Sequence, residues 1–187
     1  MIILLIAGYA GSGKDAFADQ LMKLCETHSL SYKKYAFADE VKKDVSKLYD
    51  IPLEKLYTQE GKASTITLSS GETKTLRELL IEHSAHMKTV HGKDYWAQIV
   101  CKQIDTSKYI SILSDWRYNS EIETANAYFH DQTIMKIRII RPFIKVLEDC
   151  SEHELDNFKF DIVINNYSTI DHLKMKAYEL LEIFGFV

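Results

Sequence analysis

Apolar residues are arranged along the chain as short continuous runs that alternate with segments of helical periodicity. The run at positions 2–7 contains only apolar residues, which is typical of a central parallel strand covered on both faces. In the segment that follows, Phe17, Leu21 and Leu24 recur at a spacing that places them on one face of a helix. Strands that alternate with helices in this way predict right-handed βαβ units around a parallel sheet.

The same pattern divides the rest of the chain into elements. We expect strands at residues 2–7, 32–37, 109–113, 133–140 and 160–164. We expect helices at residues 13–28, 38–49, 76–90, 95–104, 120–130 and 169–184. The polar stretch 61–74 is expected to be a loop or an irregular lobe. Ligands of parallel sheets bind beyond the carboxyl ends of the strands, and the motifs described below fall at those ends.

The composition is that of an ordinary globular protein. The chain has 187 residues, 46% of them hydrophobic and 27% charged, which suffices for one compact α/β domain. A net charge of −4 gives no support for broad binding to nucleic acid or to an anionic membrane. The apolar start is too short for a membrane helix. Cys25, Cys101 and Cys150 form no CxxC pair and no metal-ligand spacing, so we expect reduced thiols in a cytoplasmic protein.

Residues 8–14 read GYAGSGK and fit the pattern GxxxxGK between a predicted strand and a predicted helix. Glycines let the backbone curl so that its N–H groups point at phosphate oxygens, and the helix N-terminus adds a partial positive charge. Lys14 can reach the β- and γ-phosphates, and we expect it outside the hydrophobic core. A glycine-rich turn that merely joins a strand to a helix is the alternative. The predicted ATP contacts in this segment are Gly8, Ala10, Gly11, Ser12, Gly13, Lys14, Asp15 and Ala16.

Asp15 stands where such loops usually carry a serine or threonine whose hydroxyl binds Mg²⁺. Its carboxylate can serve the metal directly or through water. It can also do no more than stabilise the helix N-terminus by its charge. Both interpretations of Asp15 stay open at this point.

With this loop as anchor, the chain resembles the phage- and virus-type deoxynucleoside monophosphate kinases, a branch of the P-loop kinases. The matching segments occur in family order and span nearly the whole chain. They are GSGKD at 11–15, FAD at 37–39 followed by a helix with Lys42, TLRELL at 75–80 (TPRxLLQ in the family), SDWRYNSE at 114–121 (SDVRFPNE), and SE at 151–152 with DIVINN at 161–166 (SE…DxxIxNN). The family's GTExxR stretch is replaced by SAHMKT at 84–89, where Lys88 is a candidate substitute for the arginine. Lysine lacks the bidentate fork of arginine.

The resemblance implies a P-loop NTPase fold of the α/β class, with three α/β/α layers and a central parallel sheet. A single domain 1–187 would contain a small helical acceptor lobe at about 38–105 and a lid at about 141–157. The implied reaction phosphorylates a deoxynucleoside monophosphate with ATP and Mg²⁺. The partners expected are these small molecules, with no nucleic acid and no membrane; a homodimer is left open. A phage or viral protein of this kind would act in the host cytoplasm.

Four residues are candidates for the transfer itself: Lys14, Asp115, Arg117 and Arg141. Asp115 ends an apolar β run, where it can bind Mg²⁺ or its waters or accept a proton; an N-cap for the helix near Ser120 is the alternative. Asp15 and Asp115 are thus the predicted metal ligands. Guanidinium groups bind phosphate and stabilise the charge that spreads during transfer, although a surface ion pair is the alternative for each arginine. Arg138 alternates within a strand and is expected to be structural.

The predicted acceptor contacts are Asp39, Lys42, Arg77, Lys88, Trp96 and Arg117. Asp39 and Lys42 can instead pair with each other at i, i+3, and Trp96 can instead belong to the core. Asn166 follows the last strand, where relatives line the adenine. Because Asp15 is shared with animal-type phosphomevalonate kinases, a kinase of phosphomevalonate or of dephospho-coenzyme A remains an alternative. The second alternative function is a regulatory P-loop module that binds ATP or hydrolyses it slowly.

Overall fold

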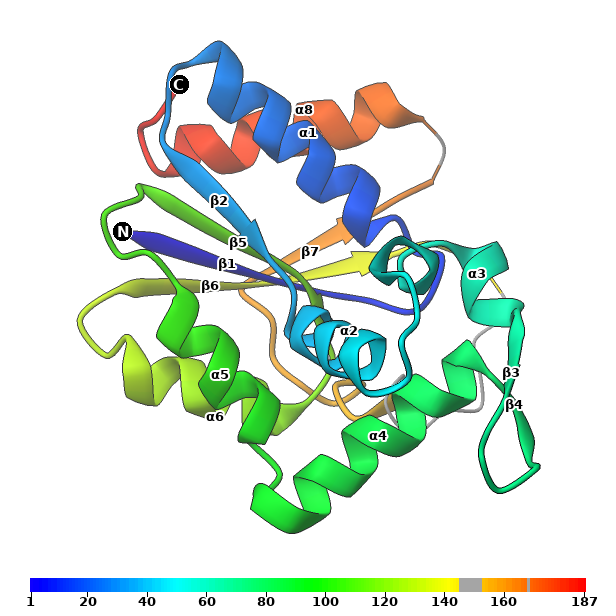
Figure 1. Cartoon of the computed structure of the whole chain (residues 1–187). Coiled ribbons are helices and arrows are strands. Elements are labelled where there is room, and N and C mark those ends of the chain that lie inside the picture. The colour runs from blue at the N-terminus through cyan, green and yellow to red at the C-terminus, as the bar shows by residue number, and fades with distance from the viewer. Residues whose placement is uncertain (145–152, 168) are drawn as a thin grey trace. The chain divides into compact units, whose positions relative to one another are not determined.

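The computed structural model describes residues 1–144, 153–167 and 169–187 (Figure 1). Its main sheet has five parallel strands in the order β2-β5-β1-β6-β7. These strands are β1 Ile2–Ala7, β2 Tyr32–Tyr35, β5 Ile110–Trp116, β6 Thr133–Ile140 and β7 Ile162–Asn165. Residues 3–7 of the central strand β1 are all buried, as expected when both faces of a parallel sheet are covered.

Helices cover the two faces of this sheet. In Figure 1, α1 (Lys14–Thr27) and α8 (Ile170–Ile183) lie side by side over one face, and α6 (Asn119–Tyr128) lies on the opposite face. The side chains of Leu4 and Ile6 pack beneath α1 and α8 in one hydrophobic cluster. The three-layer α/β/α fold with a parallel sheet, predicted from the alternation of elements, is confirmed.

The strands β1 and β5 lose their regular register at the carboxyl end. Leu5 pairs with Leu113, but Ala7 pairs with Trp116, so β5 holds one residue more than β1 in this stretch. Ser114 and Asp115 lie in the irregular part. The sequence predicted a strand at 109–113 that ends in Ser114 and Asp115; β5 includes both residues and continues to Trp116. Bulges of this kind redirect side chains at the ends of strands, here beside the GYAGSGK loop at residues 8–14.

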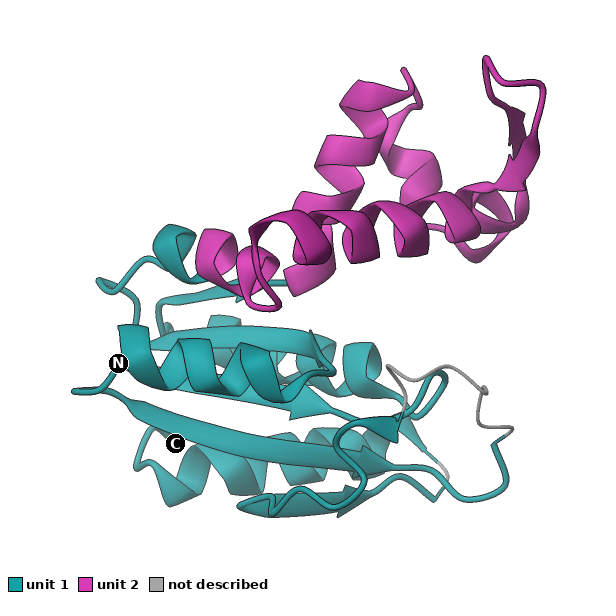
Figure 2. Ribbon diagram, turned by 90° about the horizontal axis from the view of Figure 1, so that it is seen from below, with its two compact units in different colours: residues 1–36, 101–187 teal, residues 37–100 magenta. Residues whose placement is uncertain are grey.

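The chain divides into two compact units, coloured separately in Figure 2. Unit 1 contains residues 1–36 and 101–187, and unit 2 contains residues 37–100. The elements that begin in unit 2 are α2 Phe37–Leu48, the 3₁₀ helix η1 Leu53–Leu56, α3 Gln59–Ala63, β3 Thr65–Thr67, β4 Thr73–Thr75, α4 Leu76–His91 and α5 Tyr95–Gln103. A separate hydrophobic cluster that includes Val41, Val45, Leu56, Leu79 and Trp96 holds unit 2 together.

The segment 61–74, expected to be a loop or an irregular lobe, contains the end of a short helix and most of a β-hairpin. The hairpin strands β3 and β4 pair antiparallel, and the hydroxyl oxygens of Thr67 and Thr73 lie 3.1 Å apart across them. Each strand has only three residues, which is too short for an apolar alternation to appear in the sequence. No helix in the described residues is long and apolar enough to span a bilayer.

Candidate functional site

The loop between β1 and α1 has a backbone that only glycine suits at two positions. Gly13 has φ 100°, and a Cβ there would collide with the side-chain amide of Asn166. Gly8 has φ 144°, and a Cβ there would collide with the carbonyl oxygen of Ile139. Both glycines are therefore required by contacts with residues far away in the sequence.

Lys14 folds back over this loop. Its Nζ donates to the carbonyl oxygens of Gly8 at 2.6 Å and Tyr9 at 2.9 Å, while the N–H of Ser12 closes the loop on the same Tyr9 carbonyl at 3.0 Å. Only 8% of Lys14 is exposed, yet it is not a member of the hydrophobic cluster beneath α1. The ammonium group is thus buried in a polar setting at the loop.

Helix α1 begins at Lys14, directly after the loop, without a side-chain cap. Its N-cap residue is Gly13, which has no side chain to offer, and Asp15 lies in the first turn. In the described part of the chain, the buried hydroxyl of Ser12 has no hydrogen-bond partner. An uncapped helix N-terminus beside a buried hydroxyl and a lysine is suited to bind an anion such as phosphate.

Asn166 fixes the loop from the other end of the chain. Its backbone N–H donates to the carbonyl of Ile140 at 2.7 Å, which extends the pairing of β7 with β6. Its buried side chain then donates through Nδ2 to the carbonyl oxygen of Ser12 at 2.9 Å. Asn166 thereby supports the loop, while its predicted place beside the adenine stays a prediction.

Asp15 lies at the carboxyl ends of β5 and β2. Its Oδ1 accepts a hydrogen bond from the hydroxyl of Ser114 at 3.0 Å and lies 3.4 Å from the ammonium of Lys34. The side chain of Asp15 is 79% exposed, so water and ligands reach it. Ser114 and Lys34 were missed in the sequence as partners of Asp15, because their proximity depends on the order of the strands.

These oxygens are suited to Mg²⁺. A carboxylate and a hydroxyl are hard ligands of the kind this ion prefers, and it commonly takes only one or two carboxylates, its other ligands being waters and substrate phosphates. The described residues contain no cluster of three or more acidic, histidine or cysteine side chains that could hold an ion without a substrate. The exposed Asp15–Ser114 pair therefore fits a metal whose other ligands are waters and phosphate oxygens.

The alternative role of Asp115, an N-cap for α6, is wrong. Helix α6 begins at Asn119 with Tyr118 as its N-cap residue. The carboxylate of Glu121 accepts from the N–H groups of Arg117 at 2.8 Å and Tyr118 at 3.0 Å. Asp115 lies instead half-buried in β5, in the irregular part next to Ser114.

Arg117 and Arg138 line one recess with Gly8 and Tyr9 of the loop. The sequence predicted Arg117 at this end of the sheet but assigned Arg138 only a structural place in a strand. Arg138 lies on β6 between the buried residues Ile137 and Ile139, so its side chain projects from the other face of the strand. Its guanidinium carbon lies 5.2 Å from the ring centre of Tyr9. Arg138 lies beside the loop because β6 pairs with β1 so that Arg138 is opposite Ala7. The alternation of residues within one strand does not reveal this register.

Arg141 is exposed directly after β6. The predicted lid at 141–157 begins with this residue, and its central part, residues 145–152, lies outside the described residues. The part that follows, from residue 153, is described. The catalytic role of Arg141 stays a prediction.

The candidate acceptor residues of unit 2 are held by local contacts. Lys42 donates to Asp39 at 2.9 Å and lies 4.0 Å from the ring centre of Tyr57, so the predicted i, i+3 pair is formed. Arg77 is exposed at the start of α4 and donates to the side-chain oxygen of Gln59 at 2.7 Å. These contacts leave a cationic group at the surface of unit 2, and none of them excludes acceptor binding.

Trp96 is 4% exposed within the hydrophobic cluster of unit 2, and its indole N–H donates to the carbonyl of Ser84 at 3.3 Å. A base cannot stack on an indole this buried unless the cluster opens, so the core role of Trp96 is favoured over the predicted stacking role. Lys88 is half-buried near the end of α4. Its proposed substitution for the family arginine stays a prediction.

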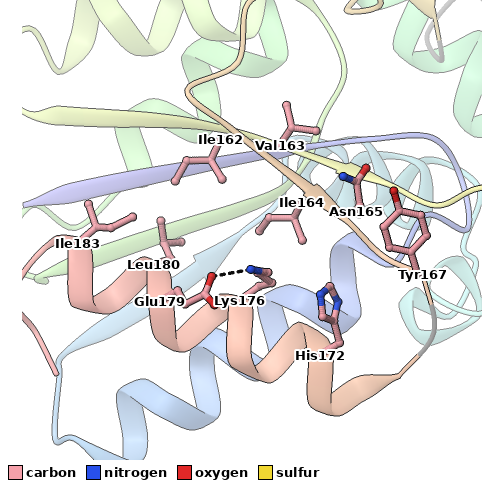
Figure 3. A pocket seen from close by; sticks show the side chains of 10 residues that line it. All are labelled: Ile162, Val163, Ile164, Asn165, Tyr167, His172, Lys176, Glu179, Leu180 and Ile183. Carbon is pink, nitrogen blue, oxygen red and sulfur yellow. Dashed lines mark hydrogen bonds and ion pairs between the residues drawn. The ribbon is translucent and has the colours of Figure 1, made fainter.

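A pocket of about 420 Å³ follows the outer edge of the sheet between β7 and α8 (Figure 3). Ile162, Ile164 and Leu180 give it an apolar wall, and Lys176 and Glu179 form an ion pair of 2.7 Å within it. Asn165 and Tyr167 lie together at one end (Figure 3). They flank Asn166 in the chain, so this end of the pocket adjoins the residue that contacts the loop.

The two described cysteines, Cys25 and Cys101, are not suited to act as nucleophiles. Burial raises the pKa of the Cys25 thiol to about 11 and that of the Cys101 thiol to about 12. Both thiols are therefore protonated and unreactive near neutral pH. Cys150 lies outside the described residues.

Comparisons with family models and with curated proteins find no match. Among solved structures, the chain is similar to the crystal structure of APE1195, with a TM-score of 0.52 and 13% identity over 97% of this chain and 95% of that one. APS kinase CysC of Mycobacterium tuberculosis, in complex with AMPPNP and APS, gives 0.49 and 12% over 96% of both chains. Shikimate kinase of Acinetobacter baumannii, in complex with shikimate, gives 0.46 and 10% over 98% and 92%. At such identities the likeness concerns the fold alone, and the two scores below 0.5 add nothing to it.

Proposed function

We propose that this chain is a P-loop kinase that transfers the γ-phosphate of ATP to a deoxynucleoside monophosphate. The observation that carries the proposal is the geometry of the GYAGSGK loop. Its lysine is held at the loop carbonyls, an uncapped helix follows, and the Asp15–Ser114 pair lies beside it. A turn that merely connected a strand to a helix would need neither a buried lysine nor support from Asn166.

The loop residues are proposed to hold the donor. Phosphate oxygens would become further partners of the Lys14 ammonium beside the Gly8 and Tyr9 carbonyls, and the start of α1 would add its partial positive charge. Mg²⁺, when bound, would neutralise charge on the β- and γ-phosphates. Asp15 and Asp115 are the residues proposed to hold it or its waters, and Asp115 is also proposed to accept a proton from the acceptor.

Charge stabilisation is the main task left to the protein, because phosphoryl transfer needs little covalent chemistry from it. Arg117, which lines the recess beside Gly8 and Tyr9, is proposed to stabilise the charge that spreads over the transferred group. Arg141 is proposed to add to this from a lid at about 141–157. The end of the pocket at Asn165 and Tyr167 is the proposed neighbour of the donor base.

The acceptor is assigned to the lobe at about 38–105 by the resemblance to deoxynucleoside monophosphate kinases. Arg77 is proposed to bind the acceptor phosphate, with Lys42, Asp39 and Lys88 as further polar contacts. The hydrogen bond from Arg77 to the neutral Gln59 leaves its charge uncompensated by that partner, so an anion can still compete for it.

An acceptor screen tests the proposal. ADP release from ATP and Mg²⁺ is measured with each deoxy- and ribonucleoside monophosphate, with phosphomevalonate and with dephospho-coenzyme A. We expect at least one deoxynucleoside monophosphate to raise ADP release far above the rate without acceptor. Stimulation by one of the other two metabolites alone would select the corresponding kinase. Slow hydrolysis that no small acceptor stimulates would favour a regulatory ATP-binding module.

A further inference from the structure

Tyr9, the second residue of the GYAGSGK loop, makes one contact through its backbone and another through its side chain. Its backbone carbonyl accepts the Lys14 ammonium at 2.9 Å. Its side-chain hydroxyl donates to Oδ1 of Asp156 at 2.6 Å, across 147 positions of the sequence. The residue that holds the loop lysine is therefore itself held by a carboxylate from the other end of the chain.

Asp156 collects three donors. Besides the Tyr9 hydroxyl, Nη2 of Arg138 donates to its Oδ1 at 2.8 Å, and Nδ1 of His153 lies 2.8 Å from its Oδ2. The other terminal nitrogen of Arg138 donates to the carbonyl of Leu155 at 2.9 Å, so the guanidinium holds both backbone and side chain of this segment. Only 13% of the Arg138 side chain and 32% of the Asp156 side chain are exposed. The position of the Asp156 carboxylate is thus fixed from several sides.

The protonation states suit this arrangement. Burial alone raises the pKa of Asp156, but hydrogen bonds from Tyr9, His153 and Arg138 outweigh it and lower that pKa to about 2. The hydrogen bond to Asp156 raises the pKa of Tyr9 above its usual value of 10.0. At neutral pH the carboxylate is therefore charged and the phenol keeps the proton that it donates.

The segment that carries Asp156 is fixed at further points of unit 1. The carboxylate of Glu154 accepts from the N–H of Asn119 at 2.8 Å, at the start of α6. Farther along, the rings of Phe158 and Phe160 pack edge-on against Trp116 at centre distances of 5.0 and 5.4 Å. These contacts hold the segment 153–160 in place, so the position of Asp156 does not depend on Tyr9 alone.

We infer that Asp156 is a positioning residue for ATP binding, which acts through Tyr9 on the shape of the loop and on Lys14. The inference rests on the proposed function, because it assigns the loop to ATP. Without the Asp156 carboxylate, the Tyr9 side chain would lose its anchor and the Tyr9 carbonyl would no longer fix one side of the Lys14 ammonium. Arg138 would also lose the carboxylate that balances its charge. The loop would then have to be ordered by the nucleotide itself, which weakens binding.

The test measures the Kd of MgATP by calorimetry and the melting temperature for the full chain and its variants. Asp156→Ala removes the acceptors, and we expect it to raise the Kd about tenfold. Asp156→Asn keeps an oxygen for Tyr9 and Arg138 and should recover part of this loss, to about threefold. Tyr9→Phe removes only the hydroxyl and should also raise the Kd about threefold. Asp131→Asn is the matched control, since it removes another carboxylate paired with a histidine, at an exposed site away from the loop.

A double-mutant cycle separates positioning through Tyr9 from a general loss of structure. In Asp156→Ala, the further change Tyr9→Phe should have little effect on the Kd, because the bond it removes is already broken. Additive losses in the cycle, or a Kd within about twofold of the parent for both single variants, would overturn the inference and leave the proposed function standing. A parent that fails to bind MgATP at all would contradict both. The KM for the acceptor should stay within about twofold throughout.

Discussion

The GYAGSGK loop in unit 1 and the candidate acceptor residues of unit 2 are held in place in different ways. Loop residues are held by partners far along the chain: Asn166 supports Ser12 across 154 positions, and Ser114 contacts Asp15 across 99. The candidate acceptor residues have partners closer in the sequence: Lys42 pairs with Asp39 within one helical turn, and Arg77 donates to Gln59 across 18 positions. Long-range support fixes the loop before a ligand arrives, whereas local surface pairs can be exchanged for a ligand. We therefore expect changes at the loop to affect ATP and changes in unit 2 to affect the acceptor.

The largest effect is expected for Lys14→Ala. It removes a phosphate contact that strengthens in the transition state and should lower turnover by about two orders of magnitude or more. Lys23→Ala, which removes an exposed lysine from the same helix, should leave turnover unchanged. Because Lys14 is buried, the melting temperature is measured with the rate. A folded Lys14→Ala variant whose activity lies within about threefold of the parent would refute the assignment of the loop.

Arg77→Ala tests the proposed acceptor site in unit 2. Loss of a charge-assisted hydrogen bond should raise the KM for the monophosphate about tenfold or more and leave the KM for ATP nearly unchanged. Lys47→Ala, at an exposed position of the same unit, is the control. Both constants come from steady-state kinetics in which each substrate is varied in turn. An effect confined to ATP would move Arg77 to the donor and withdraw the assignment of the acceptor lobe.

Asn166→Ala tests how much the contact between Asn166 and Ser12 contributes to MgATP affinity. The change removes the bond to the Ser12 carbonyl and leaves a space beside Gly13, so we expect the Kd of MgATP to rise about fivefold to tenfold. The control Asn126→Ala, at an exposed position of α6, should have no effect. Calorimetric titration decides the matter. Unchanged affinity in Asn166→Ala would show that the loop keeps its shape without the Asn166 side chain.

The effect expected for Asp15→Asn depends on the Mg²⁺ concentration. If the Asp15 carboxylate serves the metal, the variant should need about tenfold more Mg²⁺ for half-maximal activity, and excess Mg²⁺ should restore much of the rate. The matched variant Asp19→Asn removes a carboxylate that also lies near Lys34, at 3.7 Å, and should not shift the curve. Parallel Mg²⁺ titrations of Asp15→Asn and the parent would reduce Asp15 to its role at the helix N-terminus.

The smallest effect concerns acid stability. Because the pKa of Asp156 is lowered to about 2 in the folded chain, its ionised form stabilises the fold above its ordinary pKa of 3.8, and this contribution is lost as the pH falls toward 2. Asp156→Asn should therefore be less stable than the parent at neutral pH, and the difference should shrink as the pH falls below that ordinary pKa. Denaturant unfolding at several pH values measures it. A difference that does not depend on pH would assign the effect to packing and not to charge.

The sequence predicted the local features of the fold well. The strands predicted at 2–7 and 133–140 are found there, and the helix predicted at 169–184 is found at Ile170–Ile183. The GxxxxGK pattern also located the glycine-rich loop between β1 and α1, because that pattern lies within a few consecutive positions. The short hairpin in unit 2 was missed because three-residue strands carry no readable alternation.

Contacts that depend on strand order could not be predicted from spacing. Arg138 was assigned a structural role from its alternation, which its bonds to Leu155 and Asp156 fit, but alternation did not place it beside Tyr9. Lys34 gave no indication of its pairing with Asp15. The indole of Trp96 allowed two interpretations, and only its burial decides for the core. Features encoded by neighbouring residues were therefore accessible from the sequence, whereas contacts created by the fold were not.

Transfer of a labelled γ-phosphate tests the central claim most directly. The parent and Lys14→Ala are incubated with γ-labelled ATP, Mg²⁺ and each deoxynucleoside monophosphate, and the products are separated by chromatography. We predict label in a deoxynucleoside diphosphate with the parent and about a hundredfold less with Lys14→Ala. Label that appears only as inorganic phosphate, or equal transfer by both proteins, would contradict the account.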